Sequence, residues 1–194
     1  MSPLNESQQQ FLLRLARQAV EESVRNPPGG RPPQVEEPEG PLAASCGAFV
    51  TLHKGGRLRG CIGNIEASRP LYQTVGECAR SAALRDPRFE PVSPDELPLL
   101  HVEISVLSPM EEIRPEDMEV GRHGLLISSG FQRGLLLPQV AVEFNWGREE
   151  FLEETCLKAG LPPDAWKHGA KIQAFTAQVF GEPRSAPRSS PSAA

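Results

Sequence analysis

The residues best suited to chemistry lie in one short segment, Leu58-Arg59-Gly60-Cys61-Ile62-Gly63. A cysteine thiolate is a nucleophile and a metal ligand, and a nearby guanidinium favours it over the thiol. On a strand, Arg59 and Cys61 share a face, with their Cα atoms about 6–7 Å apart. Glycines in a strand, here Gly60 and Gly63, mark places where a ligand or another backbone approaches closely. The segment predicts a nucleophilic or ligand-binding Cys61, with Arg59 lowering its pKa or holding an anionic group.

The alternative is that Cys61 only packs, because a free cysteine on a strand is commonly a small buried hydrophobe. No histidine has a local spacing that makes it a base for this thiol. His123 is the best candidate, because it lies in a loop before Gly124 and could reach a binding site. Asp86 and Arg88 flank a proline and are predicted either to pair with each other or to contact substrate. The sequence contains no recognisable metal-binding or nucleotide-binding motif.

A β-hairpin is expected to position this segment. Residues 47–53 form a β-rich run, Gly55-Gly56 supplies a two-residue turn, and 58–62 return as the second strand. An uninterrupted register pairs Val50 with Cys61 and places His53 on the face opposite to the thiol.

The other elements alternate without a regular strand–helix–strand repeat. A helix capped by Asn5 precedes the hairpin, and Ser68 and Pro70 open a second helix that ends before Pro87. The remaining predictions are a strand within 97–107, short strands at 124–127 and 134–137, a helix from Trp146 to Gly160, and a last strand over 172–180. This order predicts an α+β fold with antiparallel sheets and flanking helices.

Composition limits the partners and the compartment. The net charge of −5 does not favour nucleic acid as a partner, and no run of apolar residues is long enough to cross a membrane. The cysteines are far apart and the N-terminus lacks a signal peptide, so we expect a reducing cytoplasm. Proline and glycine gather in 26–41 and 183–194, which predicts a flexible loop and a disordered tail around a domain of residues 1–182.

Several blocks of sequence occur together in an order that is similar to a known family. They are LRGCIG at 58–63, RDPRF at 85–89, EISVLSP at 103–109, HGLLI at 123–127, LLPQVA at 136–141 and KAGLP at 158–162. The chain resembles the AMMECR domain family from about residue 12 to residue 180, and more closely the type found as the A component of the bacterial AmmeMemoRadiSam system.

This resemblance implies two closely associated subdomains around a cleft, with LRGCIG at their interface. It also implies a modification pathway shared with a Memo-type protein and a radical SAM protein. Two functions stay open. In one, Cys61 is the nucleophile or ligand, and Arg59, Gly60, Gly63, Asp86, Arg88 and His123 bind substrate. In the other, the domain is a non-catalytic binding or scaffold module in which Cys61 is a core residue. The sequence identifies no cofactor, substrate or oligomeric state.

Overall fold

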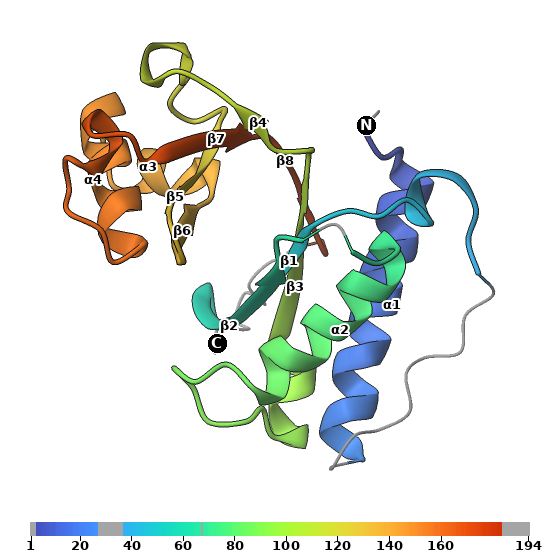
Figure 1. Cartoon of the computed structure of the whole chain (residues 1–194). Coiled ribbons are helices and arrows are strands. Elements are labelled where there is room, and N and C mark those ends of the chain that lie inside the picture. Colours follow the sequence, from blue (N-terminus) through green and yellow to red (C-terminus); the bar gives the residue numbers. More distant parts are fainter. Residues whose placement is uncertain (1–2, 27–36, 67, 184–194) are drawn as a thin grey trace, which may run out of the picture. The chain divides into compact units, whose positions relative to one another are not determined.

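The computed structural model describes residues 3–26, 37–66 and 68–183 of the chain. These residues divide into two compact units (Figure 1). Among the described residues, the N-terminal unit contains those from 4 to 105 and from 179 to 183, and the C-terminal unit contains Pro3 and residues 106–178. Most of the predicted loop at 26–41, and the predicted tail from residue 184, lie outside the described residues. No helix in the described ranges is long and apolar enough to cross a membrane.

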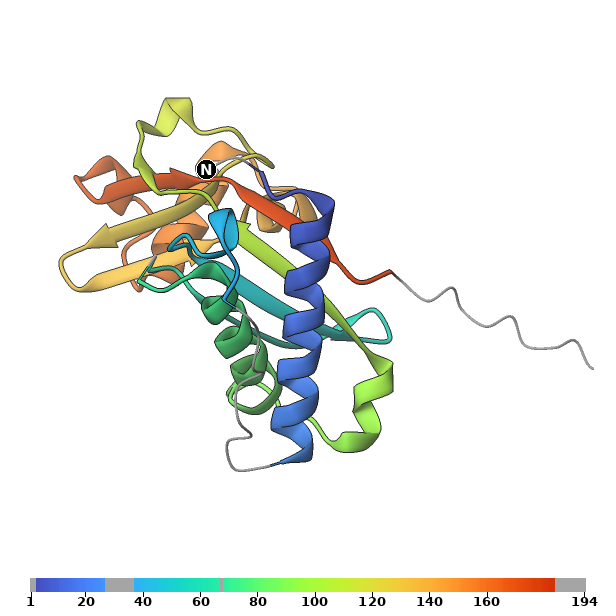
Figure 2. The ribbon, with the colours of Figure 1, turned by 90° about the vertical axis from the view of Figure 1, so that its right-hand side faces the viewer.

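The first helix, α1 (Glu6–Arg25), begins as the sequence predicts. The side chain of Asn5 accepts a hydrogen bond from the Gln8 amide, and the Gln8 side chain accepts one from the Asn5 amide, which completes a capping box. Its apolar residues recur every three or four positions, so they lie on one buried face that includes Leu12, Ala16 and Val20. That face packs against α2 (Leu71–Leu84), and the two helices lie side by side in both views (Figures 1 and 2).

Helix α2 in turn packs on a hairpin formed by β1 (Ala48–Lys54) and β2 (Arg57–Asn64). Gly55 and Gly56 make the predicted turn, and both have positive φ angles, of 58° and 78°, which glycine adopts without strain. Along β1, alternate residues are fully buried and partly exposed, because one face of the strand lies against α2. The short 3₁₀ helices of this unit are η1 (Gly40–Leu42) and η2 (Pro94–Leu99).

The described residues form two four-stranded sheets. The first has the order β2, β1, β3 (Leu100–Leu107) and β8 (Ala177–Gly181), and the second has the order β4 (Glu111–Glu112), β7 (Lys171–Phe175), β5 (Gly124–Ser129) and β6 (Gln132–Leu136). Strand β3 (Leu100–Leu107) confirms the predicted strand within 97–107. The single strand predicted over 172–180 is wrong, because β7 (Lys171–Phe175) and β8 (Ala177–Gly181) belong to different sheets. The break falls at Thr176, whose amide donates to the Ser108 side chain and whose carbonyl accepts from the Ser108 amide. These bonds fix the exchange of the chain between sheets.

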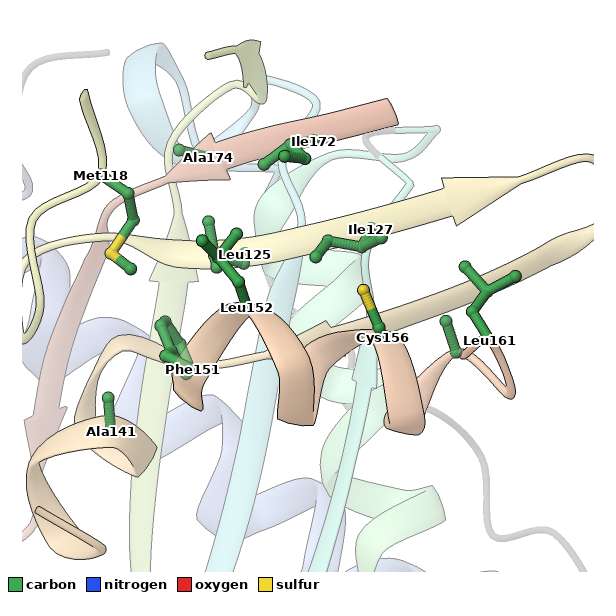
Figure 3. Close-up of a cluster of buried hydrophobic side chains, with 11 residues drawn as sticks. Met118, Leu125, Ile127, Ala141, Phe151, Leu152, Cys156, Leu161, Ile172 and Ala174 are labelled. Carbon is green, nitrogen blue, oxygen red and sulfur yellow. The ribbon is translucent and has the colours of Figure 1, made fainter. Parts of the chain in front are cut away.

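The C-terminal unit packs a sheet against α4 (Arg148–Lys158), as Figure 3 shows. Phe151, Leu152 and Cys156 of α4 lie fully buried against Leu125 and Ile127 of the sheet. The strands are β4 (Glu111–Glu112), β5 (Gly124–Ser129), β6 (Gln132–Leu136) and β7, and the 3₁₀ helices are η3 (Pro115–Asp117) and η4 (Ala165–Lys167). A short helix, α3 (Pro138–Glu143), was not predicted. The fold is therefore α+β with antiparallel strand pairs, as expected.

Candidate functional site

The LRGCIG segment is strand β2, which lies at the edge of its sheet. The hairpin follows the predicted register at the turn, where His53 pairs with Leu58. A bulge then shifts the register, so that Leu52 pairs with Gly60 and Thr51 with Cys61. The predicted pairing of Val50 with Cys61 is therefore wrong by one residue. A bulge inserts one extra residue into a strand and reverses the alternation of the faces beyond it.

This shift changes which side chains surround the thiol. Val50 and Leu52 are fully buried on the side of α2, whereas Thr51 and His53 are partly exposed on the opposite side. Because Cys61 pairs with Thr51, it shares the face of Thr51 and His53. The expectation that His53 lies on the other face from Cys61 is corrected.

The two glycines next to Cys61 are required by packing. A Cβ atom on Gly60 would lie 2.2 Å from the Ala82 carbonyl oxygen of α2, far inside contact distance. A Cβ atom on Gly63 would lie 2.1 Å from the ring of Phe49. The first contact is with backbone, which cannot rotate away. Close approach of another backbone, one of the two roles predicted for these glycines, is what the structure shows at Gly60.

The outer edge of β2 is closed by the loop that carries RDPRF. The Cys61 amide donates to Oδ2 of Asp86 at 2.8 Å, and Arg88 donates to the Cys61 carbonyl at 3.3 Å. Arg88 also binds the same carboxylate through Nε and Nη2, at 2.9 and 2.7 Å. The Asp86 side chain is only 2% exposed. The pair therefore replaces a neighbouring strand at this point of the edge.

These contacts determine the charge state of Asp86. The hydrogen bonds from Arg88, helped by that from the Cys61 amide, lower the pKa of Asp86 to about 2, against the opposing effect of burial. The carboxylate is therefore ionised at neutral pH although almost no solvent reaches it. The predicted pairing of Asp86 with Arg88 is present, and the Asp86 carboxylate also accepts a hydrogen bond from the backbone amide of Cys61.

Arg59 is bound by a different carboxylate, that of Glu96. Its Nε and Nη2 atoms donate to Glu96 at 3.0 and 2.9 Å, and Lys54 donates to Glu96 at 2.8 Å. Glu96 is 15% exposed, and these bonds, first of all that from Arg59, hold its pKa well below the usual range. Glu96 also accepts from the Ser93 amide at the start of η2. Arg59 thus joins the bulge of β2 to η2.

Cys61 is a partly exposed residue, and its thiol is held in the protonated form. Thr51 donates a hydrogen bond to Sγ over 3.3 Å. Burial raises the pKa of the Cys61 thiol, and this effect outweighs the Thr51 hydrogen bond and the positive charge of Arg88, which act in the opposite direction. The expected lowering of the pKa by Arg59 is not what the geometry provides, because the acting cation is Arg88. The other cysteines, Cys46, Cys78 and Cys156, are buried.

Both arginines lie close to one aromatic ring, that of Phe89. The guanidinium carbons of Arg59 and Arg88 lie 5.9 and 5.5 Å from the ring centroid of Phe89, within the range of cation–π contacts. The Arg88 side chain is 55% exposed, that of Arg59 is 15% exposed, and Phe89 is partly buried. We call Arg59, Cys61, Arg88 and Phe89 the hairpin surface. The sequence signal for Phe89 was its place in RDPRF.

Three further polar residues, to which the sequence assigned no role in the site, lie on the sheet face that carries Cys61: His53, Glu103 and His101. His53 Nε2 lies 4.0 Å from Oε1 of Glu103 on β3, and the negative charge of Glu103 acts on the thiol of Cys61. The ring of His101, also on β3, meets that of His53 edge to face at 6.3 Å. Only a register that includes the bulge puts Cys61 on the sheet face that carries these residues.

His123 belongs to the C-terminal unit and lies in the turn before β5. Its Nδ1 accepts a hydrogen bond from the Glu119 amide over 3.1 Å, and its own amide donates to the Glu119 carbonyl. Its ring therefore stabilises a turn of that unit. Across the described residues, no three His, Cys, Asp or Glu side chains converge in a way that could hold a metal ion.

The comparisons with known proteins agree with the α+β fold. The AMMECR1 family model matches residues 13–180. Proteins of Thermococcus gammatolerans and Thermococcus kodakarensis are each 49% identical to the chain over 185 residues, which cover 89% of both partners. The crystal structure of an uncharacterized protein from Pyrococcus horikoshii matches with a TM-score of 0.80 and 44% identity, over 89% of this chain and 90% of that one. The chain belongs to the AMMECR1 family.

Proposed function

We propose that this chain is the binding component of a cytoplasmic modification pathway that also includes a Memo-type protein and a radical SAM protein. Its substrate or protein partner docks on the hairpin surface, where Arg88 and Phe89 make the main contacts. Asp86, Gly60 and Gly63 hold that surface in place. The pathway follows from the resemblance to the AmmeMemoRadiSam A component, and the compartment from the cysteines, which are all free thiols. A binding role for His123 stays a prediction.

The observation that carries this proposal is the closed edge of β2 beside an exposed cation. Asp86 and Arg88 occupy the outward amide and carbonyl of Cys61, so a ligand cannot bind this point of the strand by adding a further strand. Recognition must then use side chains. The exposed part of Arg88 lies against an aromatic ring, and arginine and aromatic residues are the types that dominate binding energy at protein interfaces.

A second candidate function adds chemistry at Cys61 to the binding. It is favoured by the partial exposure of Cys61, since Cys46, Cys78 and Cys156 are buried. The non-catalytic function is favoured by the raised pKa of the thiol and by the carboxylate partners that already hold both arginines. The two candidates make different demands on Cys61, because binding needs the surface whereas catalysis needs the sulfur itself.

The test is the affinity of the purified chain for the Memo-type and radical SAM proteins of the same organism. We expect Phe89→Ala and Arg88→Gln to weaken binding of at least one of them about 10-fold or more, the size of an ordinary interface hot spot. Arg122→Gln is the matched control, because Arg122 is 61% exposed and pairs with a nearby carboxylate as Arg88 does. Wild-type affinity in both hairpin-surface variants would remove the proposal.

Cys61→Ser separates the two candidates. The substitution removes the thiol and keeps a small group beside Thr51. Unchanged binding with a lost pathway product would assign chemistry to the sulfur. Unchanged binding with an unchanged pathway product would exclude chemistry at Cys61 and support the non-catalytic binding function.

A further inference from the structure

We propose that the surface at the end of α3, in the C-terminal unit, docks a basic segment of a partner protein that carries a large apolar side chain beside its cations. We call Val120, Val142, Phe144 and Trp146 the α3 surface. The inference goes beyond the proposed function, because this surface belongs to the unit that does not contain the LRGCIG segment.

The end of α3 brings two aromatic rings together. The Trp146 amide donates to the Ala141 carbonyl at 2.8 Å, and the Asn145 amide donates to the Val142 carbonyl at 3.2 Å, which are the two bonds of a Schellman motif. The motif needs a left-handed residue, and Asn145 supplies it with a φ of 54°. The chain turns back there, so that the rings of Phe144 and Trp146 stack, with centroids 4.9 Å apart and planes at 17°.

One ring of this stack is anchored and the other is open to solvent. Trp146 packs against the buried cluster of the unit, to which Ala141 and Met118 belong (Figure 3). Phe144 is 62% exposed. An exposed ring that a fixed neighbour holds in place loses little side-chain freedom on binding, so it is suited to contact a partner.

Two exposed valines extend this surface. Val142 is 61% exposed and Val120 is 41% exposed. A Cβ atom on Gly121 would lie 3.1 Å from Cγ2 of Val142, so the turn that carries Val120 meets the end of α3. Of the eight large hydrophobic side chains that are exposed in the described residues, three therefore come from this one place. Single exposed apolar side chains are ordinary, whereas a group of them marks an interaction surface.

The segments that carry the α3 surface are strongly acidic. Residues 113–123 and 142–154 hold eight of the 25 acidic residues of the chain and three of its 20 basic residues. Their net charge of −5 equals that of the whole chain, so the acidic and basic residues elsewhere balance. The excess negative charge of this protein is thus concentrated around its exposed aromatic stack.

The few cations of these segments are already bound within them. Their partners are Asp117 for Arg114, Glu119 for Arg122 and the Met118 carbonyl for Arg148. Glu143 and Glu149 are exposed, and Glu143 lies between Val142 and Phe144 in the chain. A cationic ligand therefore meets carboxylates directly beside the apolar side chains.

This charge decides which occupant fits. A second copy that docked with the same surface would bring two segments of net charge −5 against each other, and like charges across an interface oppose association. A basic segment has the complementary charge. Its lysine or arginine side chains can also lie over the face of Phe144, because aromatic rings attract cations. Its apolar side chain then covers the valines.

Peptide selection tests the proposal without knowledge of the natural partner. Random peptides of about twelve residues are displayed on phage and selected on the immobilised full chain, against Phe144→Ala as the counter-target. We expect the enriched peptides to share a net positive charge and at least one large apolar residue. Each is then synthesised with a fluorescent label, and its affinity for the chain is measured by fluorescence anisotropy.

Phe144→Ala and Val142→Ser should each weaken binding of the enriched peptides about 10-fold or more. Replacing Glu143 and Glu149 together by glutamine should weaken it about 3-fold and reduce its dependence on salt. In the wild type, a rise from about 50 to about 300 mM salt should weaken binding about 5-fold or more. Phe131→Ala is the matched control, since Phe131 is fully exposed in the turn between β5 and β6 of the same unit.

The proposal is overturned if no peptide is enriched over the counter-target, or if the enriched peptides are neutral or acidic. It is also overturned if Val142→Ser binds them within a factor of two of the wild type, or if Phe131→Ala weakens them as much as Phe144→Ala does. Sedimentation that shows self-association of the wild type, lost in Phe144→Ala, would make a second copy the occupant instead. Arg88→Gln and Phe89→Ala should bind the peptides normally, so each of these outcomes leaves the function of the hairpin surface standing.

Discussion

Replacing Asp86 by asparagine tests whether a buried carboxylate holds the edge of the LRGCIG strand. An asparagine keeps a similar shape and an oxygen for the Cys61 amide, but it loses the negative charge that binds Arg88. The change therefore isolates the charge. We expect Asp86→Asn to fold and to be less stable than the wild type at neutral pH.

The magnitude follows from the pKa of the carboxylate. A fall from 3.8 in the unfolded chain to about 2 in the folded protein corresponds to about 2 kcal/mol of stability at pH 7. Because the folded pKa is the lower one, this contribution is complete above pH 4 to 5 and declines as pH falls toward 2. By pH 3 about half of it should remain.

The assay is urea unfolding of both proteins at pH 7, 5 and 3. The difference in free energy of unfolding between them should be about 2 kcal/mol at pH 7 and should narrow at pH 3. Other acid-sensitive groups, such as Glu96, cancel in this difference. Asp117→Asn, which removes an exposed carboxylate paired with Arg114, should have a much smaller effect. A difference below 0.5 kcal/mol at pH 7, or one that stays constant with pH, would refute the reasoning.

Four further substitutions test other parts of the fold. Gly60→Ala should lower the free energy of unfolding by more than about 2 kcal/mol or prevent folding, because its Cβ would meet the backbone of α2. Gly76→Ala, at an open position of the same helix, should raise the free energy of unfolding by up to about 1 kcal/mol. Thermal unfolding measures both. Glu96→Gln should lower the urea midpoint by an amount equivalent to about 1–3 kcal/mol, since two cations lose their partner. Arg17→Met should cost about 2 kcal/mol and speed proteolysis of the C-terminal strand, which it binds through Glu182.

Local patterns were enough to predict most elements of this fold. The capping box at Asn5 and the Gly55-Gly56 turn each depend on residues close in sequence, and both are present in the structure. The break of the last strand at Thr176 was not predictable in this way. It depends on Ser108, 68 positions away, whose hydrogen bonds compete with a continuous strand.

The candidate site, too, was predictable where it depends on nearby residues and not where it depends on distant ones. Its motif was visible in the sequence, but its chemistry depends on one bulge that no turn rule specified. Arg59 was expected to lower the pKa of Cys61 or to hold an anionic group beside it, because residues two positions apart on a regular strand share a face. In the structure, Glu96 binds Arg59, and the bulge places Cys61 beside Thr51 instead. The bulge and the distant carboxylates therefore decide together which residues surround the thiol.

The most direct test of the hairpin surface is a nitrogen-15 NMR titration of the labelled chain with the Memo-type protein and, separately, with the radical SAM protein. The account predicts that at least one of them shifts or broadens the amide signals of residues 59–63 and 86–89 first. Changes confined to residues 106–178, or no change with either protein, would contradict it.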